Sequence, residues 1–123
     1  MPKKPKKHPI GPQLRVYLTP QDHLGPGKAD LLALIAKTGS IVAAGKAMDM
    51  SYRRAWLLVD TLNKMFKTPL VEKSKGGKGG GGGAELTALG RDVLARYRAM
   101  EKKTAKAVAS DLAALLKVAA GSH

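Results

Sequence analysis

Apolar residues recur every three or four positions through the middle of the chain, and this spacing predicts helices. A first helix is expected between Pro26, which suits a first helical turn, and Gly39, which suits a left-handed cap. Ser40 follows as the N-cap of a second, two-turn helix that breaks at residues 49–50. The pattern therefore places two short helices almost directly one after the other.

A third helix is expected to begin after Ser51, another N-capping residue, and to stop before Thr68 and Pro69. Its apolar stripe predicts which side faces the core. The residues expected inside are Ala55, Leu58, Val59, Leu62 and Phe66. Three capped helices in tandem are thus expected across residues 26–67.

Short strands are expected on either side of these helices. Residues 14–18 alternate apolar with polar before a proline, and residues 70–74 and 84–86 have the composition of a hairpin with a glycine-rich tip. This pattern predicts a mainly α fold with a small β-hairpin.

A last helix is expected from its N-cap Thr87 to about residue 120, which makes it roughly 45 Å long at 1.5 Å per residue. Its apolar stripe comprises Leu89, Val93, Tyr97, Met100, Val108, Leu112 and Leu115. A helix of this length outreaches so small a domain, so its far half must pack against another chain or fray. Dimerisation through this helix is the simpler interpretation.

The composition of the chain indicates what kind of partner it binds. The chain has 123 residues, which allow one domain with a modest core, and its 22 Lys and Arg against 9 Asp and Glu give a net charge of +13. Such a charge favours nucleic acid or an anionic membrane surface. Residues 1–12 are rich in Lys and Pro and are expected to form a disordered basic arm, followed by a DNA-binding domain at 13–86 and the long helix at 87–120.

Other classes of protein are disfavoured. There is no cysteine and no apolar run of the roughly 20 residues that span a bilayer, so we expect no thiolate metal site, no membrane partner and a cytoplasmic location. The three histidines, His8, His23 and His123, are far apart in the sequence and show no metal-ligand or catalytic spacing. We therefore expect no enzyme activity and no cofactor.

Two helices joined by a tight turn fit the helix-turn-helix, in which the second helix presents its N-terminal residues to the major groove of DNA. If Ala55 and Val59 face the core, Tyr52, Arg53 and Trp56 point outward. Either Arg53 or Arg54 could then reach a guanine edge, while Tyr52 and Trp56 could lie against a thymine methyl group or donate to a phosphate. The alternative is that Trp56 fills the core and both arginines are merely solvated.

The glycine-rich segment at residues 75–83 offers backbone amides and two charges, Lys75 and Lys78, for contact with a phosphate chain. We interpret it as the wing of a winged helix-turn-helix, although a glycine run alone is more often only a flexible loop. The candidate DNA-binding residues are Ser40, Ser51, Tyr52, Arg53, Arg54, Trp56, Lys75 and Lys78.

Several of these segments, taken in order, resemble the N-terminal domain of the ModE family of molybdate-responsive regulators and, more broadly, the LysR-type winged helix. The segments are Gly39-Ser40-Ile41, Ala44-Gly45-Lys46, Ser51-Tyr52-Arg53-Arg54-Ala55-Trp56, the glycine-rich segment 76–81 and Leu86-Thr87-Ala88-Leu89-Gly90. The resemblance implies that Ser51, Tyr52, Arg53 and Trp56 occupy the recognition helix, that Lys75 and Lys78 lie in the wing, and that the last helix pairs two subunits.

The chain departs from this family in two respects. Asp49 stands where the family usually has glycine, so the turn is expected to be slightly strained. Full regulators continue into oxyanion-binding domains, and nothing after Gly121 could form one, so no molybdate site is expected in this chain.

The sequence leaves two functions open. The first is a homodimeric, sequence-specific transcriptional regulator that binds double-stranded DNA at half-sites about one helical turn apart. The second is a non-specific architectural protein that coats DNA through its lysine arm and wing. The lysine arm favours the second function, and the cluster from Tyr52 to Trp56 favours the first.

Overall fold

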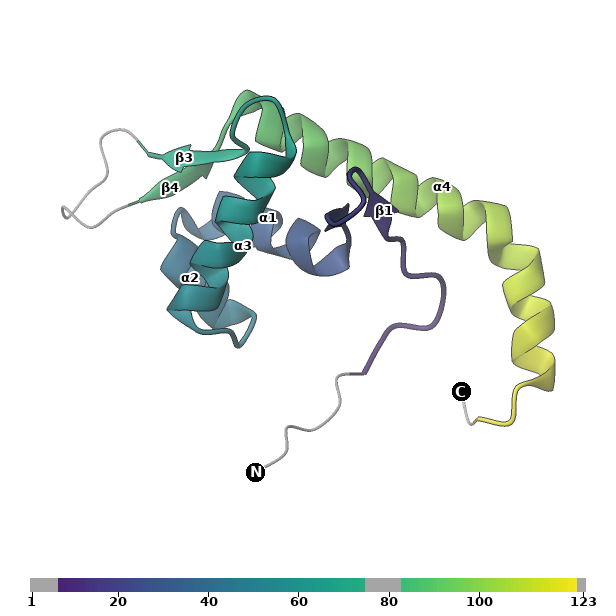
Figure 1. Ribbon diagram of the computed structural model, residues 1–123. Coiled ribbons are helices and arrows are strands. Elements are labelled where there is room, and N and C mark those ends of the chain that lie inside the picture. Colours follow the sequence, from purple (N-terminus) through teal and green to yellow (C-terminus); the bar gives the residue numbers. More distant parts are fainter. Residues whose placement is uncertain (1–6, 75–82, 122–123) are drawn as a thin grey trace.

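The computed structural model describes residues 7–74 and 83–121 of the chain (Figure 1). In order, the elements are β1 (Val16–Tyr17), β2 (His23–Leu24), α1 (Pro26–Thr38), α2 (Ile41–Ala47), α3 (Tyr52–Met65), β3 (Val71–Lys73), β4 (Ala84–Leu86) and α4 (Ala88–Val118). The strands pair as two antiparallel ribbons, β1 with β2 and β3 with β4. The expected mainly α fold with a small hairpin is confirmed.

The helices begin where their capping residues predict. The hydroxyl oxygens of Ser40, Ser51 and Thr87 each accept a hydrogen bond from the backbone N–H three residues further on, at 3.1, 3.1 and 3.0 Å. Gly39 has a φ of 72°, the left-handed conformation that glycine adopts without steric cost, and its N–H donates to the Ile35 carbonyl.

The structure differs from the expectations in two details. Helix α3 ends at Met65 rather than at residue 67, because Phe66 is already extended and acts as its C-cap. The strand expected near residue 16 has a partner that the sequence did not indicate, since Val16 pairs with Leu24 and Tyr17 with His23. Strands of two residues are too short to show an alternation of apolar and polar positions.

The core lies where α1, α2 and α3 meet the β3–β4 hairpin, and α4 closes it from one side (Figure 1). Its fully enclosed side chains are Leu31, Leu32, Ile35, Val59, Leu62, Leu70 and Tyr97. No helix within residues 7–74 and 83–121 is long and apolar enough to cross a membrane.

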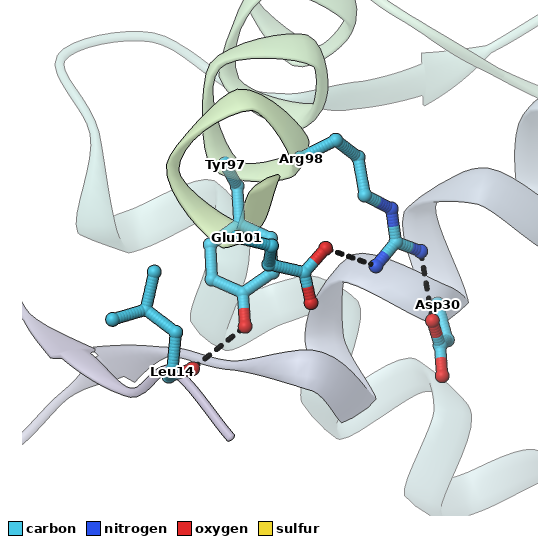
Figure 2. A network of polar contacts seen from close by, with 5 residues as sticks. All are labelled: Leu14, Asp30, Tyr97, Arg98 and Glu101. Atoms are coloured by element: carbon cyan, nitrogen blue, oxygen red, sulfur yellow. Dashed lines mark hydrogen bonds and ion pairs between the residues drawn. The ribbon is translucent and has the colours of Figure 1, made fainter. Parts of the chain in front are cut away.

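The first half of α4 is held to the rest of the fold by polar contacts (Figure 2). The Tyr97 hydroxyl donates to the Leu14 carbonyl at 2.6 Å, and burial raises the pKa of that phenol to about 12. The Arg98 guanidinium bridges Asp30 of α1 at 2.7 Å and Glu101 at 3.0 Å. These contacts fix the direction in which α4 leaves the core.

The second half of α4 runs past the rest of the molecule and bends towards its end (Figure 1). Leu115 is 64% exposed and Val118 is 81% exposed. Residues 7–12, part of the expected arm, contain no helix or strand, and Gly11 lies beside Leu112. Residues 1–6 lie outside the described residues, so the disorder of the arm stays a prediction.

Candidate nucleic-acid interface

The turn between α2 and α3 sets the angle at which α3 is presented. The Met50 N–H donates to the Gly45 carbonyl and the Asp49 N–H to the Lys46 carbonyl, both at 3.0 Å, which is the Schellman arrangement that ends a helix. Asp49 occupies the left-handed position of this motif, with a φ of 56°. Asp49, which stands where glycine was expected, is therefore the residue with the costly left-handed backbone.

Small side chains let α2 and α3 approach closely. A Cβ atom at Gly45 would lie only 2.9 Å from the Cβ of Ala55, and both Ala44 and Ala55 are fully buried. The helix pair is thus held by direct backbone proximity, and any larger residue at Gly45 must push the two helices apart.

Helix α3 has two contrasting faces. Ala55 and Leu62 are fully buried and Val59 is 2% exposed, whereas Tyr52 is 57% exposed and Trp56 is 43% exposed. The two exposed rings meet edge to face, with centroids 6.3 Å apart. The alternative in which Trp56 fills the core is therefore wrong, and an aromatic pair lies on the outer surface.

The two arginines lie on different sides of α3. Arg53 lines a shallow surface together with Tyr52, Trp56 and Leu57, whereas Arg54 lines a separate cleft with Leu58. Only Arg53 therefore shares the outer face with the aromatic pair. Ser40 and Ser51 start α2 and α3, and their oxygens are engaged in the capping bonds described above.

The β3–β4 hairpin is anchored to α3 by one side chain. The Oδ1 atom of Asn63 accepts hydrogen bonds from the N–H groups of Leu70 and Val71 at 2.8 and 3.0 Å, and its Nδ2 donates to the Val71 carbonyl at 3.1 Å. The Ala84 N–H also donates to the Gly39 carbonyl at 2.9 Å, which ties the other strand to the turn before α2. The hairpin is thus fixed relative to both helices of the motif.

Asn63 was missed from the sequence. The available signal was a polar residue directly beside the buried Leu62 near the end of a helix, but its partners become apparent only when the chain has turned back at Pro69. Lys75 and Lys78, the two candidate wing residues, lie outside the described residues.

A cleft of about 320 Å³ separates the outer face of α3 from the hairpin. Its walls include Tyr52, Trp56 and Asn63 from α3, and Glu72 and Lys73 from β3. The surface is therefore concave between the helix and the wing, with aromatic groups on one side and charged groups on the other.

Three helices followed by a two-stranded hairpin, with an exposed face on the third helix, define a winged helix-turn-helix protein. The family model for bacterial regulatory helix-turn-helix proteins of the lysR family matches residues 28–91. The chain belongs to this family, as the resemblance in its sequence predicted.

Several regulators are similar to this chain. It is 41% identical over 87 residues to the molybdenum-pterin-binding protein MopB of Rhodobacter capsulatus, covering 71% of this chain and 32% of MopB. It is 45% identical over 71 residues to the molybdenum transport protein ModE of Azotobacter vinelandii, covering 58% of this chain and 26% of ModE. It is 40% identical over 72 residues to the DNA-binding transcriptional dual regulator ModE of Escherichia coli K12, covering 58% of this chain and 27% of that protein. The chain thus spans no more than 32% of the length of these relatives.

A solved structure shares the fold. The crystal structure of a CbnR_DBD–DNA complex matches with a TM-score of 0.57 and 22% sequence identity, over 72% of this chain and 95% of that one. At this identity the match supports the architecture and not the contacts.

Proposed function

We propose that this protein is a sequence-specific regulator of transcription that inserts α3 into the major groove of double-stranded DNA. The observation that carries the proposal is the exposure of Tyr52 and Trp56 on a helix whose opposite face is fully buried. Large aromatic side chains on a protein surface are typical of a binding site. A cytoplasmic location goes with this function.

Each candidate residue has a role in this proposal. Arg53 reads a guanine edge, because it is the arginine on the outer face of α3, and the aromatic pair contacts thymine methyl groups or the sugar–phosphate chain. Ser40 and Ser51 lie at helix N-termini, where a hydroxyl and backbone N–H groups can bind a phosphate. Lys75 and Lys78 bind the backbone from the wing.

We further propose that the protein acts as a homodimer through α4. Beyond Tyr97, no residue of α4, a helix that the structure describes in full, is buried, and yet Val108, Leu112 and Leu115 continue the apolar spacing. A second copy presents the same stripe, so the two helices can cover each other around a two-fold axis. The two copies of α3 would then meet half-sites about one helical turn apart.

The proposal is tested by selecting bound sequences from a random duplex pool at two salt concentrations. Base preference persists when salt is raised, whereas the electrostatic part of the affinity falls. Arg53→Ala should weaken the selected site and flatten preference at one position, and changing Lys75 or Lys78 should weaken all DNA alike. Arg96→Ala is the matched control, because Arg96 is an exposed arginine on α4. A parent protein that selects no sequence contradicts the proposal.

The high net charge favours a second candidate, a non-specific architectural protein. Four of the chain's lysines lie in the segment 1–12. Deleting this segment separates the two functions, because an architectural binder should lose most of its affinity, whereas a sequence-specific regulator should keep its site preference.

A further inference from the structure

A second cleft flanks α3 on the side away from the hairpin. It has a volume of about 840 Å³ and is bounded by the α2–α3 turn, the start of α1 and the segment before β1. On α3 its wall is Arg54 and Leu58, whereas Tyr52 and Trp56 line the cleft beside the wing. The outer face of α3 therefore forms a ridge between two clefts.

Cations from three separate segments line this second cleft: Arg15 before β1, Lys28 in α1 and Arg54 in α3. Across residues 7–74 and 83–121, none of the three forms an ion pair with a carboxylate, unlike Arg98, which holds two. Lys28 donates one hydrogen bond, to the His23 carbonyl at 2.9 Å. Asp49 is the acidic residue in the lining. Folding has thus gathered three positive charges here that its own ion pairs do not use.

His23 also lines the cleft, and its pKa is lowered mainly by burial and in part by this charge. Burial lowers the pKa of its imidazole, and the positive charges of Lys28 and Arg15 lower it further, against an opposing contribution from Asp22. With three cations and one carboxylate in its lining, the cleft carries a net positive charge, which favours an anion.

We propose that this cleft binds a backbone phosphate of the DNA strand that borders the major groove on the side away from the wing. The inference rests on the proposed function. The major groove is about 12 Å wide, so a helix inserted in it has a phosphate chain on each side. The hairpin meets one chain, and the Arg15, Lys28 and Arg54 cluster lies where the other would pass. Guanidinium and ammonium groups form charge-assisted hydrogen bonds with phosphate oxygens. This assignment makes Arg54 a phosphate contact and leaves base reading to Arg53.

The test is the salt dependence of binding to the selected site. The triple variant Arg15→Gln, Lys28→Gln and Arg54→Gln should bind about tenfold more weakly or worse. Its slope of log affinity against log salt should shrink by about 0.9 for each phosphate that the variant no longer neutralises. The base preference should stay that of the parent protein.

The matched control is Lys102→Gln, Lys106→Gln and Lys117→Gln, which removes the same charge from exposed positions on α4. It should keep a slope near that of the parent. Because Lys28 also bonds to the chain, the double variant Arg15→Gln and Arg54→Gln is measured alongside, with thermal unfolding to confirm that each variant is folded. An equal decrease of slope in the control and the cleft variant overturns the inference.

A titration with inorganic phosphate at constant ionic strength separates DNA from a free oxyanion. Shifts of the amide resonances of residues 25 and 27–29 at low phosphate, together with an unchanged DNA salt slope in the cleft variant, would make this a free-anion site and overturn the inference. If the parent selects no DNA sequence, the proposed function fails. If it selects one and the cleft variant keeps its slope, only this inference fails.

Discussion

The two faces of α3 differ in what the fold needs from them. The inner face, formed by Ala55, Val59 and Leu62, is enclosed by α1, α2 and the hairpin, so packing constrains which residue types can stand there. The outer face, with Tyr52, Arg53, Trp56 and Leu57, contributes little to the core and leaves large apolar groups in solvent. The difference teaches that one face holds the helix in place and the other is available for a partner.

The largest loss of stability is expected from a substitution on the inner face of α3. Leu62→Ala removes a fully buried side chain and should lower the free energy of unfolding by about 2–5 kcal/mol. Leu57→Ala, on the same helix at 57% exposure, should change it by less than about 0.5 kcal/mol. Urea unfolding of both variants measures the contrast, and equal losses would contradict the assignment of the two faces.

A smaller loss is expected where α2 presses on the inner face. Gly45→Ala places a methyl group 2.9 Å from Ala55. Because two Cβ atoms cannot pack at this distance, overpacking should cost about 2–3 kcal/mol, of which improved helix propensity offsets about 1. Gly27→Ala is the control, because a methyl group there has no atom within 4 Å and should be neutral or stabilising. Chemical denaturation compares the two variants, and a Gly45→Ala protein as stable as the parent would show that the helices are not in close contact.

The next largest loss of stability is expected at Tyr97 of α4, the helix that closes the core. Tyr97→Phe removes the hydrogen bond to Leu14 and should cost about 1 kcal/mol at neutral pH. The folded pKa of Tyr97 is raised to about 12 from 10.0, so the folded state holds its proton more tightly than the unfolded state. The stability that the protonated Tyr97 phenol contributes is therefore fully present below pH 10 and is lost as the pH rises from 10 towards 12.

Stability measured from pH 8 to pH 11.5 checks the sign. The parent should lose more stability over this range than Tyr97→Phe does. Tyr52→Phe, which removes a hydroxyl from an exposed tyrosine, is the control and should change the stability at pH 8 by less than about 0.5 kcal/mol. Parallel curves for the parent and Tyr97→Phe would contradict the role of the buried phenol.

The smallest effect is expected at the turn that orients α3. Asp49→Gly removes a side chain from a left-handed position but gives the unfolded chain more freedom, so a gain of less than about 1 kcal/mol is expected. Asp49→Ala should instead destabilise, because alanine tolerates a positive φ less well than aspartate. Thermal unfolding ranks the three proteins, and an alanine variant at least as stable as the glycine variant would be inconsistent with the turn geometry.

The local features of this fold could be predicted because they depend on residues close in the sequence. Ser40, Ser51 and Thr87 cap their helices as expected, and the three-to-four spacing placed Trp56 outside and Val59 inside. The i,i+3 pair of Arg98 with Glu101 is likewise a neighbour contact.

Features that join distant segments could not be predicted in this way. The Asn63 contacts with the hairpin, the Arg98 contact with Asp30 and the cluster of Arg15, Lys28 and Arg54 all depend on how the helices pack. The sequence showed these residues only as polar or charged positions on surfaces. The DNA-binding roles of the candidate residues remain predictions.

The single tryptophan of the chain tests the central claim most directly, because Trp56 lies on the outer face of α3 and is 43% exposed. Acrylamide quenching of its fluorescence is measured in the free protein and in the complex with a selected duplex. If the outer face enters the groove, quenching should fall steeply as DNA is added and should level off at saturation. A saturated complex in which Trp56 is quenched as readily as in the free protein would contradict the account.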